Sequence, residues 1–171
     1  MATAINSQLK YSIRIKKAEE VDENFHSRYN CKEKTYAYVI NNDEQASAIF
    51  RNMEYHFPKK LDVEKMKEAA KYFEGEHDFS SFKSSGTSSK SSIRKIYNAE
   101  VSTCNGRIII KLTGNGFLYN MVRIISGTLL EVGMGTIEPQ DIEKIIEDKD
   151  RKKAGKTLPP QGLYLVKVEY S

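Results

Sequence analysis

The stretch from Phe117 to Val132 sets the first condition on the fold, because it is apolar on most of its surface. Its apolar residues recur at the spacing of one broad helical face, namely Leu118, Met121, Val122, Ile125, Leu129 and Val132. The stretch also contains Asn120, Arg123, Ser126 and Glu131, so it is too short and too polar to span a bilayer. We therefore expect a helix that other elements of a globular protein cover.

Length and composition fit such a protein. The chain has 171 residues, of which 39% are hydrophobic and 29% charged, so a single soluble domain over residues 1–171 is expected. No basic segment followed by an apolar run opens the chain, which indicates no secretory signal. Two cysteines, Cys31 and Cys104, are too few for a disulfide framework. We expect reduced thiols in a cytoplasmic protein that does not enter a membrane.

Strands outnumber helices in the predicted order of elements. Asn105-Gly106 separates two strand-like runs and is a strong signal for a two-residue hairpin, since both central residues of such a turn need positive φ. The predicted strands cover Leu9–Lys16, Arg28–Ile40, Ile93–Thr103, Arg107–Thr113 and Leu163–Tyr170. These elements predict an α+β fold, which we expect to hold a mostly antiparallel sheet with helices packed on one face.

Two further helices and one loop complete the predicted order. Asp62 can cap a helix that ends before Gly75, and Pro139 can begin another that carries Ile142, Ile145 and Ile146. The segment from Glu44 to Phe57 shows only short helical character. Residues 80–92 contain eight serines and little apolar surface, so they predict a flexible loop.

The charged residues allow an RNA partner without requiring one. The formal net charge is +4, and basic residues cluster at Lys32 and Lys34, at Lys83, Lys90, Arg94 and Lys95, and at Arg151, Lys152, Lys153 and Lys156. Such clusters suit phosphate, although a solvated protein face has the same composition. Tyr36 and Tyr38 follow Lys32 and Lys34, a pattern that can stack a base and hold its phosphate. A strand with one tyrosine in the core explains it equally well.

Arg123 is the residue that most demands an explanation. It is the only charge between Phe117 and Leu130. A buried guanidinium costs several kcal/mol unless it is paired. Arg123 must therefore either reach solvent along a polar stripe or meet a carboxylate, and no obvious carboxylate partner lies in the chain.

Other chemistries have weaker support. The three histidines lack metal-ligand spacing, so no metal site is predicted. Cys31 lies five residues from His26 without a third catalytic group. Gly114-Asn115-Gly116 lacks the third glycine of a dinucleotide fingerprint.

Five segments, taken in order, resemble the TruA-type tRNA pseudouridine synthases. Phe25 to Tyr38 is similar to the family pattern F-H-A-R-F…K-x-Y-x-Y, with Ser27 in place of alanine. Gly75 to Phe82 is similar to G-x-H-D-F-x-x-F, and Phe117 to Arg123 to F-x-x-x-M-V-R. The helix continuation Gly127–Gly133 comes next, and Arg151 with Gly162–Leu165 completes the series.

The resemblance implies an isomerase that converts uridine to pseudouridine in the tRNA anticodon stem-loop, as a homodimer and without a cofactor. It assigns catalytic roles to Arg123, which would pair with the catalytic aspartate, and to Tyr36, which would stack on the uracil and move a proton. It assigns substrate-binding roles to Tyr36, to Leu163 on the floor of the site, and to Arg28, which would fill the gap left by a flipped nucleotide.

The family's G-R-T-D motif, which carries the catalytic aspartate, does not occur in this sequence. We therefore expect the chain to be the C-terminal portion of a synthase, inactive alone, with Arg123 directed at the open face of the sheet. Two alternatives stay open, a non-catalytic RNA-binding module and a dimerisation module.

Overall fold

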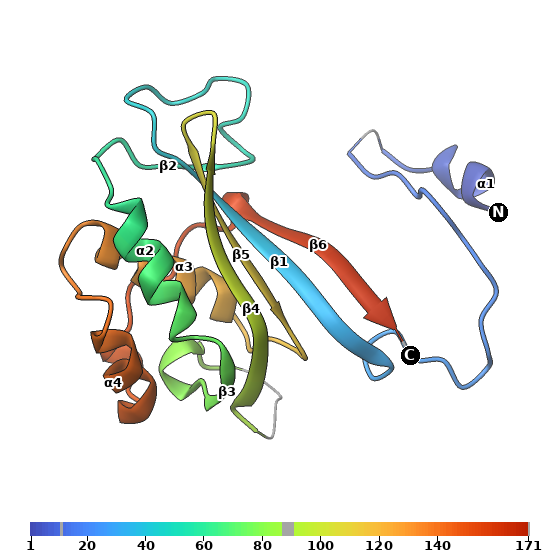
Figure 1. Cartoon of the computed structure of the whole chain (residues 1–171). Helices are drawn as coiled ribbons and strands as arrows, with labels where there is room; N and C mark the ends of the chain where they lie inside the picture. The colour runs from blue at the N-terminus through green and yellow to red at the C-terminus, as the bar shows by residue number, and fades with distance from the viewer. Residues whose placement is uncertain (11, 87–90, 171) are drawn as a thin grey trace. The chain divides into compact units, whose positions relative to one another are not determined.

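The computed structural model describes residues 1–10, 12–86 and 91–170, which divide into two compact units, Met1–Asn30 and Cys31–Ser171. The first unit holds α1 (Ala2–Asn6), turns and extended chain (Figure 1). The strand predicted over Leu9–Lys16 is wrong for the residues described there, which exclude Tyr11. The side chain of Asn6 bonds both backbone groups of Ile15, at 2.8 and 2.7 Å. Ile15 therefore cannot offer those groups to a neighbouring strand.

The second unit is built on a six-stranded sheet, whose strands are β1 (Cys31–Asn41), β2 (Tyr55–His56), β3 (Gly75–Asp78), β4 (Ile93–Cys104), β5 (Arg107–Gly114) and β6 (Leu163–Tyr170). The strand order is β2-β1-β5-β4-β3, and β6 pairs with the edge of β1 away from β5. Only the short β1–β2 pair is parallel. The predicted α+β fold with a mostly antiparallel sheet is confirmed.

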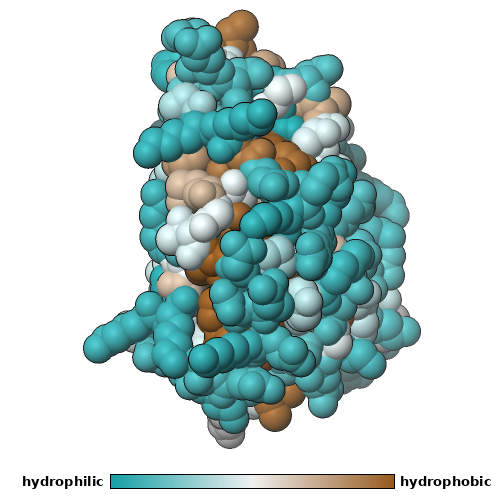
Figure 2. All heavy atoms as spheres, turned by 60° about the vertical axis from the view of Figure 1, so that its left-hand side comes forward, coloured by the Kyte–Doolittle hydropathy of each residue, from teal (hydrophilic) through white to brown (hydrophobic). Residues whose placement is uncertain are grey.

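Three helices, α2 (Val63–Lys71), α3 (Met121–Gly133) and α4 (Asp141–Asp148), lie together on one side of the sheet (Figure 1). The backbone N–H of Lys65 donates to Asp62 Oδ1 at 3.1 Å, which confirms the predicted cap of α2. The core between sheet and helices is apolar, and α3 alone contributes seven fully or nearly fully buried large apolar side chains to it, from Met121 to Val132. The view toward the helices shows mostly hydrophilic side chains, with a narrow, interrupted hydrophobic strip (Figure 2).

The β4–β5 hairpin turns at the predicted residues. Asn105 and Gly106 have φ angles of 48° and 72°, so both central residues adopt the left-handed conformation that the turn requires.

The serine-rich segment is only partly a loop. Ser80–Phe82 forms a short 3-10 helix in which Ser81 and Phe82 are buried, and Ser81 Oγ donates to the carbonyl of Ile145 at 2.6 Å. The expectation of a loop throughout residues 80–92 is therefore wrong at its start, because two serines have structural partners there. Ser80 Oγ donates to Asp78 at 2.6 Å, which lowers the pKa of that carboxyl. The predicted flexibility at residues 87–90 lies outside the described residues.

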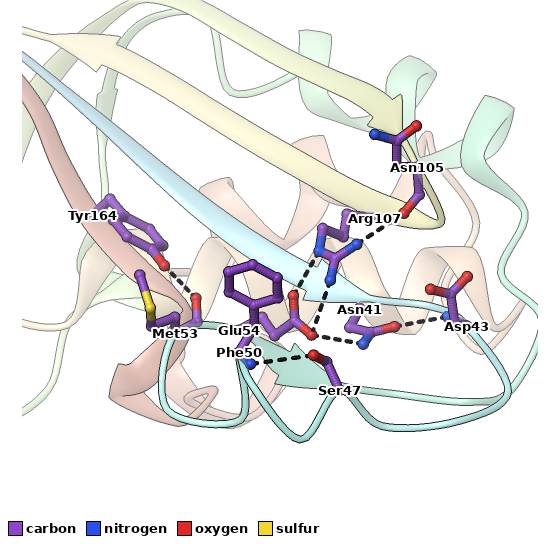
Figure 3. Close-up of polar contacts among 9 residues, drawn as sticks. All are labelled: Asn41, Asp43, Ser47, Phe50, Met53, Glu54, Asn105, Arg107 and Tyr164. Carbon is purple, nitrogen blue, oxygen red and sulfur yellow. Dashed lines mark hydrogen bonds and ion pairs between the residues drawn. The ribbon is translucent and has the colours of Figure 1, made fainter.

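An ion pair between the buried Glu54 and the partly exposed Arg107 holds the segment from Asn42 to Glu54 against the sheet (Figure 3). The Glu54 side chain is 4% exposed and accepts from Arg107 Nε at 2.7 Å and from Asn41 Nδ2 at 2.7 Å. The Arg107 guanidinium also lies over the Phe50 ring, 5.2 Å from its centroid. This segment forms turns rather than a helix before it enters β2.

Candidate active site

A pocket of about 310 Å³ opens where β1, the start of β6 and the N-terminal end of α3 come together. Three residues that the sequence proposed for the site, Tyr36, Arg123 and Leu163, line this one pocket. The other lining residues are Phe117, Leu118, Tyr119, Asn120, Met121, Val122 and Pro160. Three segments that are far apart in sequence thus converge on one small, mostly apolar site.

Tyr36 presents an aromatic face to the pocket. It shares one face of β1 with Tyr38 and Ile40, because side chains alternate along a strand. Tyr38 is fully buried and its hydroxyl donates to the carbonyl of Pro159 at 2.6 Å, whereas Tyr36 is half-buried. The ring of Tyr36 meets Phe117 edge to face, with 5.2 Å between centroids. Of the two tyrosines, Tyr38 is thus the core residue and Tyr36 the pocket residue.

The Tyr36 hydroxyl makes no hydrogen bond within the described part of the chain. Burial raises the pKa of Tyr36, and the nearby Cys31 thiol raises it further. The phenol therefore stays protonated at neutral pH, and its oxygen remains able to donate or accept one hydrogen bond at the pocket.

Arg123 is the third residue of α3 and is half-buried. Its Nε donates to the carbonyl of Leu158 at 2.6 Å, and its Nη1 donates to Asn120 Oδ1 at 3.0 Å. Both acceptors are neutral. Over residues 1–10, 12–86 and 91–170, no aspartate or glutamate oxygen lies within 4.0 Å of the guanidinium. The charge of Arg123 is thus oriented by hydrogen bonds but is not balanced by a carboxylate.

The position of Arg123 corrects one expectation. We expected this side chain to face the open side of the sheet, but it lines a pocket with Tyr36, on the face of β1 whose Tyr38 packs in the core with residues of α3. The helix that the sequence predicts from Phe117 begins only at Met121, so Arg123 lies in its first turn, at the end that lines the pocket with Tyr36.

The segment that holds Arg123 is itself fixed by a close crossing of two backbones. A Cβ atom on Gly127 would lie 1.9 Å from the carbonyl oxygen of Lys156, and one on Gly155 would lie 2.6 Å from the backbone nitrogen of Thr128. Arg151 donates to the carbonyls of Ala154 and Gly155 at 3.1 and 3.0 Å. These contacts place the carbonyl of Leu158 beside Arg123.

The sequence missed this role of Arg151, which it grouped with surface cations. No sequence pattern marks a guanidinium that binds carbonyls of its own loop, although the match of Arg151 to a family position was a signal. Lys152, Lys153 and Lys156 are exposed, and Lys156 lies near the Tyr55 ring, 5.9 Å from its centroid.

Arg28 belongs to the first unit, where it is exposed and its backbone N–H donates to His26 Nδ1 at 3.2 Å. Its assignment stays a prediction. Within the described ranges, no three His, Cys, Asp or Glu side chains gather in a geometry that could hold a metal ion. In the same ranges, the helices are all too short or too polar to cross a bilayer.

Comparison with known proteins agrees with the resemblance. The model of a family described as tRNA pseudouridine synthase matches residues 69–171. The tRNA pseudouridine synthase A of Caldicellulosiruptor bescii is 52% identical over 98% of this chain and 68% of its own length. The proteins of the same name from Acetivibrio thermocellus and Clostridium acetobutylicum are 50% and 51% identical, over 98% and 97% of this chain and 68% of their own lengths.

Proposed function

Because the chain belongs to the tRNA pseudouridine synthase family, we propose that it supplies the uracil-binding pocket of an enzyme that isomerises uridine in the tRNA anticodon stem-loop. The observation that carries the proposal is the meeting of Tyr36, Arg123 and Leu163 in one pocket of about 310 Å³. That volume is at the small end of ligand sites, as a single nucleobase requires.

The reaction needs little from the protein beyond placement and charge. The C1′–N1 bond of uridine breaks and a C1′–C5 bond forms, while C5 loses a proton and N1 gains one. The exchange is redox-neutral, so no cofactor is required. In this proposal the ring of Tyr36 stacks on the uracil and its hydroxyl moves a proton, while Leu163 packs against the base.

Access to the target requires that the nucleotide leave its stack. We propose that Arg28 fills the resulting gap, as the matched family motif implies. The exposed lysines between α4 and β6, including Lys152 and Lys156, would then contact RNA phosphates and hold the stem-loop in place.

The central charge of the site is Arg123. In the proposal its guanidinium pairs with the catalytic carboxylate that attacks or deprotonates the nucleotide. Gly-Arg-Thr-Asp does not occur in the 171 residues, and neutral acceptors hold Arg123 in the structure. We therefore propose that these residues alone do not turn over uridine.

The test is a chimaera in which this chain replaces the matching two thirds of the Caldicellulosiruptor bescii protein. The readout is release of tritium from an anticodon stem-loop labelled at C5 of uridine, since that position loses its proton. The chimaera should release tritium and the 171-residue chain should not. Turnover by the chain alone, or a folded chimaera without activity, would refute the proposal.

We further propose a cytoplasmic homodimer, which rests on the resemblance to the family. Sedimentation of the chimaera at micromolar concentration tests it, and a monomer under those conditions would reject it.

A further inference from the structure

The conformation of Asn120 is unusual for a residue that begins a helix. Its φ and ψ angles are 61° and 6°, so its backbone is left-handed immediately before α3. Apart from glycine, asparagine is among the residues that adopt this conformation most readily. The side chain of a residue at this position normally accepts a hydrogen bond from a backbone N–H of the first helical turn. Asn120 makes no such bond.

The side chain of Asn120 instead joins two other groups. Its Oδ1 accepts from Nη1 of Arg123 at 3.0 Å, and its Nδ2 donates to Ser84 Oγ at 3.0 Å. The orientation of the amide is unambiguous, because a guanidinium can only donate. The backbone N–H of Ser84 also donates to the carbonyl of Tyr119, at 3.1 Å. The amide is therefore fixed from both ends.

A neutral amide has a specific advantage next to Arg123. A carboxylate at this position would form an ion pair with the guanidinium and occupy its charge. The amide oxygen orients the same N–H group and leaves the positive charge available to an incoming anion.

From these contacts, and resting on the role proposed for Arg123, we infer that Asn120 is a positioning residue. Its side chain does not cap α3 but orients the Arg123 guanidinium toward the catalytic carboxylate. The hydrogen bond to Ser84 fixes the Asn120 amide in the orientation that this requires.

Asn120→Gly is the sharpest variant, because glycine keeps the left-handed backbone and removes only the side chain. The matched control is Asn105→Gly, the same change at a left-handed residue in the β4–β5 turn. In the chimaera, Asn120→Gly should lower kcat by about tenfold or more with KM unchanged, since misplaced catalytic groups cost rate rather than binding. Asn120→Asp should lower kcat further, and Asn105→Gly should leave kcat unchanged.

Nitrogen-15 NMR of the 171-residue chain tests the positioning without catalysis. The Nη resonances of Arg123 should be separate in the native chain and in Asn105→Gly, and averaged by rotation in Asn120→Gly. If Asn120→Gly does not fold, Ser84→Ala should produce the same averaging to a smaller degree. Separate Nη resonances in folded Asn120→Gly would overturn the inference whether or not the chimaera is active. A native kcat in an active Asn120→Gly chimaera would also overturn it.

Discussion

The two tyrosines of β1 differ most clearly in what their hydroxyls contact. Tyr38 donates to the carbonyl of Pro159 from a fully buried position, whereas Tyr36 has no such bond within the described residues. Tyr38→Phe leaves that carbonyl without its donor and should lower the free energy of unfolding by about 1–3 kcal/mol. Tyr36→Phe should change it by less than about 0.5 kcal/mol. Urea unfolding measures both, and a large loss for Tyr36→Phe would place its hydroxyl in a buried bond.

The same tyrosines predict how stability responds to alkali. Burial is the main cause that raises the pKa values of both Tyr36 and Tyr38 above the usual 10.0. The folded protein thus disfavours the phenolates relative to the unfolded chain. The two tyrosines contribute their full share to the free energy of unfolding below pH 10, and that share is lost as pH rises through their pKa values in the folded protein. The melting temperature of the native chain should fall more steeply above pH 10 than that of the Tyr36→Phe, Tyr38→Phe double variant. Parallel curves of melting temperature against pH for the two proteins would show that Tyr36 and Tyr38 do not cause the loss of stability in alkali.

At the scale of elements, the ion pair of the buried Glu54 with the partly exposed Arg107 anchors the segment before β2 (Figure 3). Arg107→Ala would leave the Glu54 charge buried, with Asn41 as its one remaining side-chain partner among the described residues, so it should cost about 2–4 kcal/mol of stability. The exposed pair of Glu64 and Lys67 on α2 is the control, where Lys67→Ala should cost at most about 0.5 kcal/mol. Equal losses in the free energy of unfolding for Arg107→Ala and Lys67→Ala would show that burial of the carboxylate does not determine the cost of removing its partner.

The crossing of α3 by residues 154–158 makes a second prediction at this scale. A Cβ atom on Gly127 would meet a backbone carbonyl, which cannot move aside as a side chain can. Gly127→Ala should therefore cost at least about 2 kcal/mol. Gly116→Ala is the control, because its Cβ atom would be in ordinary contact with Arg94 at 3.6 Å. Thermal unfolding of the two variants should separate them, and similar melting temperatures would argue against a tight crossing.

The sequence predicted turns and helix ends well where their conformation depends on residues adjacent in the chain. The positive φ demanded by Asn105-Gly106 and the cap at Asp62 depend only on neighbouring residues, and both are confirmed. Ser81 was misread because its partner, the carbonyl of Ile145, lies 64 residues away. The hydrogen bonds of the site could not be predicted for the same reason. One acceptor of Arg123 is a backbone carbonyl 35 residues away, and a backbone carbonyl is present at every residue, so the sequence does not mark it.

For the whole molecule, charge should govern binding to tRNA. The formal net charge is only +4. Several cationic side chains also form bonds within the protein, as Arg151 does with the carbonyls of its own loop. We expect a few phosphate contacts and weak binding by the 171-residue chain. Affinity measured by fluorescence anisotropy should fall by about tenfold or more between about 50 and 200 mM salt, because lysine and arginine release counterions from phosphates. Tyr36→Phe should show the same salt slope, and an affinity independent of salt would exclude this mode of binding.

The proposed role of Arg123 is best tested by removing its charge in the active chimaera. Single-turnover tritium release should fall at least about a hundredfold in Arg123→Met and less in Arg123→Lys, which keeps a charge but loses the planar fork. The affinity for the stem-loop should stay within about twofold of the native chimaera, because Arg123 is proposed to pair with a carboxylate rather than with a phosphate. A folded Arg123→Met chimaera that releases tritium at the native rate would show that the reaction does not need the charge of Arg123.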